Sequence, residues 1–216
     1  MAARKACCSH RKCLKSPERT ELFAEIDKAK AEGRHFMFVD IGANVGMFSL
    51  LVASHAGSNA NILALEPEPE NLKRLRFNVA ANPGIHVRIV PIALGAMSGN
   101  LTLEVDPRDR GGTRTRQPSA DDQRNATTVE CRPLASVLKE QNIASIDALK
   151  IDVEGSEDEI LTAFFQQADK ALWPRLLIVE DARDSWHSDL YSFLADCGYT
   201  VASRSKLNAM LRGAAS

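Results

Sequence analysis

A turn with two glycines, at residues 40–46, has the composition of a ligand-binding loop. It reads Asp40-Ile41-Gly42-Ala43-Asn44-Val45-Gly46 and lies between a predicted strand and a predicted helix. Glycine permits a tight turn and lets a ligand approach the backbone closely. The start of the helix offers unpaired N–H groups to a negatively charged group. Two glycines four residues apart, with Asn44 able to adopt a left-handed backbone between them, favour an adenosyl-amino-acid ligand over a pyrophosphate.

An acidic residue ends the next predicted strand. Glu66 follows the apolar run 61–65 and lies 20 residues after Gly46. A carboxylate in this place can accept hydrogen bonds from both hydroxyl groups of a ribose. Each feature alone also fits an ordinary turn or a solvated strand end, but their order and spacing together favour nucleoside binding.

Further charged residues follow two other apolar runs. Lys150, Asp152 and Glu154 alternate with apolar residues, so a strand here would carry the three charges on one face. Charges inside a sheet are costly unless they are paired or face a cleft. Glu180 and Asp181 follow the next apolar run. Because ligands bind outside the carboxyl ends of parallel strands, we expect these groups near the site.

The composition excludes several classes of protein. The 216 residues suffice for one domain, and 44% of them are hydrophobic, which excludes disordered and collagen-like chains. No run approaches the roughly 18 apolar residues of a membrane span. The 27 basic and 28 acidic side chains give a net charge of −1. We therefore expect neither a nucleic-acid nor a membrane partner.

Residues 1–15 are expected to form a disordered basic tail without the apolar segment of a secretory signal. The five cysteines of the chain are Cys7, Cys8, Cys13, Cys131 and Cys197. Their odd number and the crowding of three in the tail favour free thiols in the cytoplasm over disulfides. Adjacent cysteines do not have the spacing of a zinc module.

The remaining chain alternates short apolar strands with amphipathic helices. An N-terminal helix is expected within 16–35, with Pro17 at its first position and Gly33 as its stop. Ser156 and Glu159 have the spacing of a capping box, and Ser185 is expected to cap a later helix. The predicted strands are 36–41, 61–66, 86–91, 101–105, 146–153, 176–179, 199–203 and 207–211. This alternation predicts a doubly wound, Rossmann-like α/β domain over 36–216.

Three blocks of this sequence resemble the FkbM-type family of S-adenosylmethionine-dependent methyltransferases. They are Val39-Asp40-Ile41-Gly42-Ala43-Asn44-Val45-Gly46, Leu65-Glu66-Pro67 and Leu149-Lys150-Ile151-Asp152-Val153-Glu154-Gly155-Ser156-Glu157. The third block is the most specific, and the resemblance extends over about 36–203. It implies a class I methyltransferase fold, a three-layer αβα sandwich with a mostly parallel seven-stranded sheet. It also implies transfer of a methyl group to a hydroxyl of a sugar or secondary metabolite.

The resemblance implies roles for individual residues. The glycine turn would hold the methionine part of the cofactor, Glu66 the ribose, and two residues after the third strand would lie near the adenine. The implied cofactor-binding residues are Asp40, Gly42, Asn44, Gly46, Glu66, Ile92, Ala93 and Asp152. The chain departs from the family in its short segment before the first strand and in Ala135, where an acid is frequent.

A hydroxyl acceptor must lose a proton, so we expect a base within hydrogen-bond reach. The candidate catalytic residues are Asp152, Glu154 and His187, of which Asp152 would act as base or orient the acceptor. A magnesium site formed by Asp152 with Glu180-Asp181 is the alternative, but we expect a metal-free enzyme.

Residues 106–128 are predicted to be a long loop, because they are polar and nearly devoid of apolar side chains. Four arginines in the loop slightly favour a lid over an anionic or polyhydroxylated acceptor: Arg108, Arg110, Arg114 and Arg116. A solvated loop remains the alternative.

Two other functions are compatible with this fold. An NAD(P)-dependent oxidoreductase would need glycines where Asn44 and Met47 stand, so two of three positions of its motif fail. A non-catalytic cofactor-binding module is the other alternative, since a fold alone does not establish a function. The sequence does not determine the oligomeric state.

Overall fold

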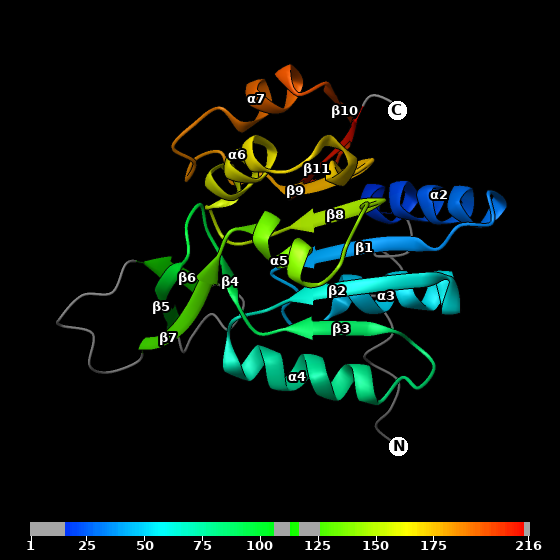
Figure 1. The fold of residues 1–216 in the computed structure, drawn as a ribbon, viewed down its shortest axis with the longest axis horizontal. Coiled ribbons are helices and arrows are strands. Elements are labelled where there is room, and N and C mark those ends of the chain that lie inside the picture. The colour runs from blue at the N-terminus through cyan, green and yellow to red at the C-terminus, as the bar shows by residue number, and fades with distance from the viewer. Residues whose placement is uncertain (1–15, 106–112, 117–125, 214–216) are drawn as a thin grey trace.

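Seven strands form the central sheet, in the order β10-β11-β9-β8-β1-β2-β3 (Figure 1). The computed structural model describes residues 16–105, 113–116 and 126–213. The strands are β1 (Phe36–Ile41), β2 (Ala60–Leu65), β3 (Val87–Val90), β8 (Ala148–Ile151), β9 (Leu176–Glu180), β10 (Tyr199–Arg204) and β11 (Asn208–Gly213). β11 pairs antiparallel with both of its neighbours, whereas the pairs among β3, β2, β1, β8 and β9 are parallel. The prediction of a mostly parallel, seven-stranded α/β fold is confirmed.

Helices cover both faces of this sheet. They are α2 (Pro17–Ala31), α3 (Met47–Ala56), α4 (Pro69–Ala80), α5 (Leu134–Glu140), α6 (Glu157–Gln167) and α7 (Leu190–Asp196), with short 3-10 turns η1 (Gly57–Asn59) and η2 (Lys170–Leu172). One core joins α5, α6 and α7 to the sheet, and a second joins α2 and α3 to its other face. None of the described helices combines the length and the apolar composition that a membrane crossing requires.

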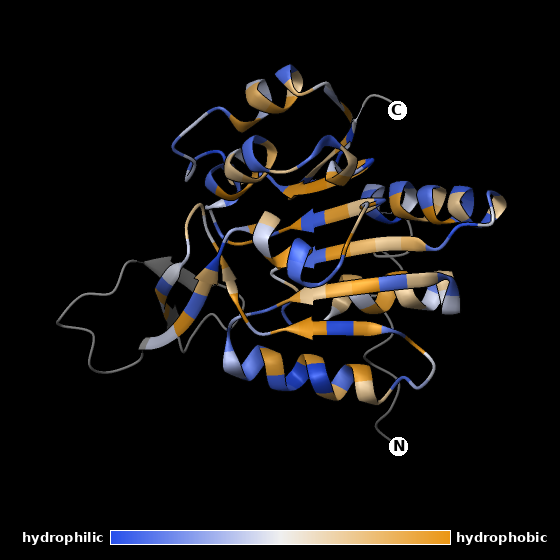
Figure 2. Cartoon of the chain, in the orientation of Figure 1, coloured by the Kyte–Doolittle hydropathy of each residue, from blue (hydrophilic) through white to orange (hydrophobic). Residues whose placement is uncertain are grey.

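Burial on both faces explains the continuous apolar runs of the central strands. In β1, Val39 and Ile41 belong to the core under α5–α7, while Phe36 and Phe38 belong to the core under α2 and α3. A parallel strand between two helical layers needs apolar side chains on both faces. Figure 2 shows the contrast between apolar strands and α4, whose surface carries several hydrophilic positions.

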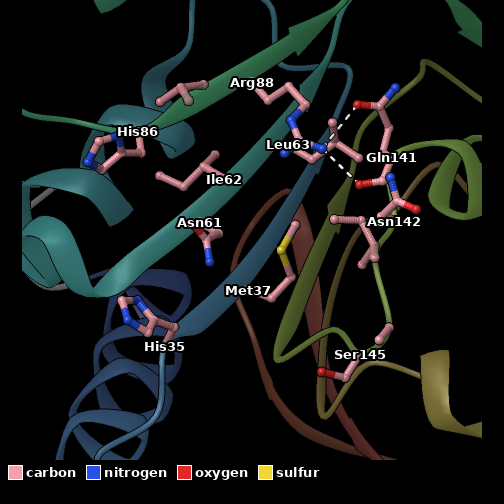
Figure 3. A pocket seen from close by; sticks show the side chains of 13 residues that line it. His35, Met37, Asn61, Ile62, Leu63, His86, Arg88, Gln141, Asn142 and Ser145 are labelled. Carbon is pink, nitrogen blue, oxygen red and sulfur yellow. Dashed lines mark hydrogen bonds between the residues drawn. The ribbon is translucent and has the colours of Figure 1, made fainter.

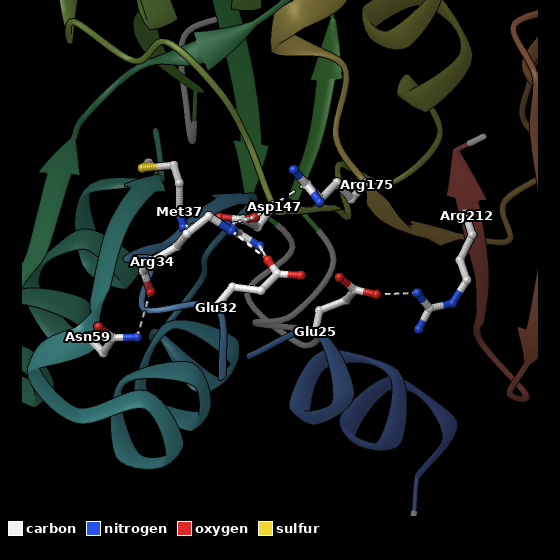
Figure 4. A network of polar contacts seen from close by, with 8 residues as sticks. All are labelled: Glu25, Glu32, Arg34, Met37, Asn59, Asp147, Arg175 and Arg212. Carbon is white, nitrogen blue, oxygen red and sulfur yellow. Dashed lines mark hydrogen bonds and ion pairs between the residues drawn. The ribbon is translucent and has the colours of Figure 1, made fainter. Parts of the chain in front are cut away.

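A polar network fastens the N-terminal helix to the amino-terminal ends of the strands (Figure 4). Asp147 is buried and accepts hydrogen bonds from the Arg34 guanidinium and the Met37 backbone N–H, both at 2.8 Å. Glu25 of α2 forms an ion pair with Arg212 of β11. α2 begins after Ser16, whose hydroxyl accepts from the Arg19 N–H, and Gly33 follows it with a φ of +68°.

A second sheet of four strands lies beyond the carboxyl ends of β2 and β3 (Figure 1). Its strands are β4 (Ala93–Leu94), β5 (Gly99–Val105), β6 (Thr113–Arg116) and β7 (Ala126–Arg132), in the order β4-β7-β5-β6. The prediction of a loop over 106–128 is therefore wrong for β6 and the start of β7. These polar segments lack a strong strand pattern, but β6 and β7 become strands by pairing with the two edges of β5. Residues 106–112 and 117–125 of the predicted lid lie outside the described residues, as does the predicted tail 1–15.

Two local predictions were wrong, and one helix was not predicted. α5 was not predicted, although its Leu134, Val137 and Leu138 share a buried face. Ser156 precedes α6 but its side chain makes no capping hydrogen bond, so the predicted capping box is absent. α7 begins at Leu190 with Asp189 as its cap, so the predicted cap at Ser185 is wrong. The Asp189 carboxylate accepts from the Ser192 N–H and so caps α7, while Glu157 and Asp158 at the start of α6 bond other segments.

Candidate active site at the carboxyl end of the sheet

The glycine turn brings β1 against the end of β8. Gly42 has a φ of +68°, and a Cβ atom there would lie 1.8 Å from the carbonyl oxygen of Asp152. Asn44 and Gly46 also have positive φ values, +51° and +89°. The backbone N–H groups of Gly42 and Ala43 both donate to the carbonyl of Leu65, at 3.0 Å. Only glycine fits at residue 42, because both the conformation and the contact exclude a side chain.

Asp40, in β1, connects the strand before this turn to the helix α3 after it. It is buried, and its Oδ2 accepts hydrogen bonds from the backbone N–H and the hydroxyl of Ser49, at 3.0 and 2.6 Å. Burial raises the pKa of this carboxyl. Its Oδ1 has no hydrogen-bond partner among the described residues. An unused acceptor atom therefore remains beneath the start of α3.

Glu66 is held rigidly next to the turn. It is buried, its Oε2 accepts from the Asn44 N–H at 2.6 Å, and its Oε1 accepts from the Glu68 N–H at 2.9 Å. Burial raises the pKa of the Glu66 carboxyl. Each carboxylate oxygen has more than one acceptor position, so a ligand hydroxyl can still bind to it.

A cavity of about 130 Å³ opens between these groups. Six of the eight predicted cofactor-binding residues line it: Gly42, Asn44, Glu66, Ile92, Ala93 and Asp152. The other two, Asp40 and Gly46, are not among its lining residues. The cavity is smaller than the roughly 300–1,000 Å³ of a pocket that encloses a drug-sized ligand, so a whole nucleoside would extend over the strand ends.

Several lining residues were not predicted as site residues. They are Asn71, Leu94, Leu103, Ser156 and Ile160. Leu103 is fully buried and comes from β5, so the second sheet contributes a wall of the cavity. No motif marks Asn71, Leu94, Leu103 or Ile160, whereas Ser156 belongs to the third sequence block.

Three carboxylates gather beside the cavity. Asp152, Glu154 and Glu180 each place one oxygen within 4.8 Å of the others. The buried Lys150 donates to Oδ2 of Asp152 at 2.9 Å. β8 ends at Ile151, so Glu154 does not share a strand face with the other charges as predicted. A turn brings it there instead, with a φ of +59°.

The cluster makes Glu180 a proton-binding group near neutral pH. Burial, together with the charges of Asp152 and Glu154, raises the pKa of Glu180 to about 8. The oxygen atoms of the cluster are also of the type that magnesium prefers. Asp181, the other residue of the predicted alternative, instead pairs with Arg183 and Arg204, at 2.7 and 3.2 Å.

His187 lies outside this group. It is exposed in the loop 181–189 and does not line the cavity. Its backbone N–H donates to Oδ2 of Asp158 at 2.9 Å. Of the three predicted catalytic residues, the structure therefore brings Asp152 and Glu154 together, with Glu180 beside them.

A larger cavity, of about 690 Å³, lies at the opposite, amino-terminal ends of the strands (Figure 3). Polar side chains such as His35, Asn61 and His86 line it, and the Arg88 guanidinium donates to the carbonyl of Gln141 at 2.8 Å. None of the predicted site residues lines this cavity. Since ligands of open parallel sheets bind at the carboxyl ends, the smaller cavity is the candidate active site.

The architecture is that of a Rossmann-like methyltransferase. The chain resembles the crystal structure of methyltransferase FkbM from Methylobacillus flagellatus KT, with a TM-score of 0.54 and 18% sequence identity. The match covers 82% of this chain and 43% of that one. At this identity the likeness shows the fold.

Sequence comparison assigns the family. The methyltransferase FkbM domain model matches residues 40–201, so the chain belongs to the FkbM methyltransferase family. Methyltransferase sdnD of Sordaria araneosa is 30% identical over 194 residues, which cover 76% of this chain and 73% of sdnD. Hexuronic acid methyltransferase AglP of Haloferax volcanii is 25% identical over 122 residues, which cover 56% of this chain and 47% of AglP. The chain thus spans about half the length of AglP.

Proposed function

We propose that the protein transfers a methyl group from S-adenosylmethionine to a hydroxyl oxygen of a sugar or secondary metabolite. Family membership supports methyl transfer, and the name of the relative AglP supports a sugar as acceptor. One observation carries the cofactor assignment. It is the buried Glu66 carboxylate at the end of β2, bonded to the Asn44 N–H at the edge of the cavity.

The lining of the cavity fits an adenosyl-amino-acid cofactor. Glu66 retains acceptor positions for the ribose hydroxyls. Ile92, Ala93 and Leu103 would offer an apolar surface to the adenine, and the turn at Gly42 would hold the methionine part. When bound, the cofactor supplies a methyl group on a sulfonium, which is already a good leaving group.

Asp152 is the proposed base or orienting residue for the acceptor hydroxyl. Lys150 fixes its carboxylate, and Glu154 and Glu180 each place an oxygen within 4.8 Å of it. Alignment of the acceptor oxygen with the methyl group contributes most of the rate. His187, exposed in its loop, has the least support among the three candidates.

Separate calorimetric titrations with S-adenosylhomocysteine, NAD and NADP test which cofactor the protein binds. We expect only S-adenosylhomocysteine to bind, and NAD binding in its place would favour the oxidoreductase.

Transfer of a radiolabelled methyl group to a panel of methyl hexosides and methyl hexuronides tests the acceptor. Asp152→Ala should abolish this transfer while binding persists. Binding without transfer by the unmodified protein would favour a non-catalytic module.

The proposed reaction uses no metal ion. Exhaustive EDTA treatment is expected to leave methyl transfer unchanged, and a loss of activity that magnesium restores would overturn the proposal of a metal-free reaction.

The proposed compartment is the cytoplasm, in keeping with the free thiols of Cys131 and Cys197.

A further inference from the structure

Two buried carboxylates at the start of α6 face the backbone of neighbouring segments. Glu157 is fully buried, and its Oε1 accepts a hydrogen bond from the Val153 N–H at 2.8 Å. Its Oε2 accepts from the Gly155 N–H at 3.1 Å and from the indole N–H of Trp186 at 2.8 Å. One side chain thus bonds both the turn after β8 and the loop after β9.

Asp158 strengthens the second of these connections. Its Oδ2 accepts from the backbone N–H groups of His187 and Ser188, both at 2.9 Å, and from the Ser188 hydroxyl at 3.0 Å. The loop 181–189 is therefore anchored to the first turn of α6 at two adjacent residues. Because this loop begins directly after Glu180, its path determines what lies next to the carboxylate cluster.

The turn that Glu157 holds is a strained one. Glu154 is not a glycine, yet its φ is +59°, a conformation that persists only when surrounding contacts enforce it. Gly155 follows with a φ of +110°, and a Cβ atom there would lie 2.7 Å from Cβ of Ser185. The turn and the loop are thus in direct contact.

We propose that Glu157 is a positioning residue, whose carboxylate ties the turn 152–155 to the loop 181–189 and so holds Asp152 and Glu154 beside the cavity. The inference rests on the proposed function, because these two residues matter only if the acceptor binds there. Three N–H donors point at Glu157, and only a carboxylate offers acceptor oxygens to all of them. A glutamine would turn its NH₂ group toward at least one donor.

The test uses a protein with a single tryptophan. Trp173→Phe leaves Trp186 as the fluorophore, and the Trp173 indole N–H has no partner among the described residues. Glu157→Gln and Glu157→Ala are compared in this background with Glu159→Gln, a matched control on the exposed side of the same helical turn.

Both Glu157 variants are expected to increase acrylamide quenching of Trp186 and to speed amide exchange in 152–155 and 181–189 by at least about tenfold, since they lose hydrogen bonds to a charged group. Exchange in the central strands should not change. Methyl transfer to the hexoside panel should fall by about tenfold, while S-adenosylhomocysteine affinity changes by less than about threefold, because Glu66 and the glycine turn do not contact Glu157.

Glu154→Gly provides a rescue experiment. Glycine adopts a positive φ without strain, so the double variant Glu154→Gly/Glu157→Gln should regain part of the exchange protection in 152–155. Unchanged quenching and exchange in Glu157→Gln would overturn the positioning role, as would a uniform rise in exchange over the whole chain. Failure of S-adenosylhomocysteine to bind the unmodified protein would instead overturn the proposed function, and the fluorescence and exchange results would not depend on it.

Discussion

Glu66 has a structural role in addition to the binding role proposed for it. Its two oxygens accept backbone hydrogen bonds from Asn44 and Glu68, which fix the carboxylate at the mouth of the cavity. The Glu68 carboxylate in turn accepts from the first N–H groups of α4. A charged acceptor held in this way can bind two ribose hydroxyls without rearrangement, and that geometry is the physical basis of the cofactor assignment.

Glu66→Ala is expected to weaken S-adenosylhomocysteine binding by at least about tenfold, because each hydrogen bond to a charged group contributes about 1.5–3 kcal/mol. Calorimetric titration gives the dissociation constant. Glu70→Ala, at an exposed position in the first turn of α4, is the control and should bind as tightly as the unmodified protein. Equal affinities for all three proteins would contradict the ribose assignment.

Glu180 gives stability a pH dependence of defined sign. Its pKa is raised from 4.5 to about 8 in the folded state, so folding favours the protonated form. The stabilisation is fully present below pH 4.5 and is lost as the pH rises through about 8. Glu180→Gln, which mimics the protonated form, should therefore lose less stability between pH 6 and pH 8.5 than the unmodified protein. Thermal unfolding at both pH values measures this, with Glu159→Gln as control.

Among the elements, β1 and the helix after it depend on backbone conformation at the glycine turn. Gly42 must have a positive φ, and the end of β8 leaves no room for a side chain there. Gly57, after α3, has nearly the same φ, +64°, but nothing lies within 4 Å of the Cβ position. Alanine at Gly57 therefore tests the free-energy cost of the backbone conformation alone, and alanine at Gly42 tests that cost together with the steric contact.

Gly57→Ala is expected to lower the free energy of unfolding by about 1–3 kcal/mol, the cost of a backbone with φ +64° and ψ −139° that essentially only glycine adopts. Gly42→Ala should cost at least about 2 kcal/mol more, since the clash with Asp152 must displace a strand end. Urea denaturation measures both values. Equal losses would mean that the contact between the turn and β8 does not matter.

The elements differ in how far local sequence determined them. α2 begins and ends near the predicted residues, because Pro17 marks its start and Gly33 its stop. β6 and β7 were not predicted, because their polar residues become strands only by pairing with β5. The start of α6 was assigned to a capping box, but Glu157 and Asp158 bond segments distant in sequence instead.

At the scale of the whole molecule, two sheets meet at the cavity. The central sheet supplies the glycine turn, Glu66 and Asp152, and the smaller sheet supplies Ala93, Leu94 and Leu103. Leu103 is fully buried although it lies in the smaller, mixed sheet, in which β4 pairs parallel with β7 and the other pairs are antiparallel. The second sheet therefore has a place in the binding site as well as in the fold.

Leu103→Ala is expected to lower stability by about 2–5 kcal/mol, as for other buried leucines, and also to weaken S-adenosylhomocysteine binding. Leu138→Ala, a fully buried leucine of α5 that does not line the cavity, is the control and should lose stability alone. Denaturation and calorimetry on both variants separate the two effects. Unchanged affinity in Leu103→Ala would remove Leu103, though not Ala93 and Leu94 of β4, from the proposed site.

The sequence by itself determined the strand–helix alternation, the parallel sheet, the glycine turn and the acid at residue 66, because each depends on residues close together in the chain. Only the tertiary structure decided that a turn, and not a shared strand face, brings Glu154 to Asp152, that Leu103 lines the cavity and that His187 lies outside it. Those positions follow from long-range contacts, namely the meeting of strand ends, the docking of the second sheet and the bonds from α6 to the loop after β9. Local periodicity carries no information about such contacts.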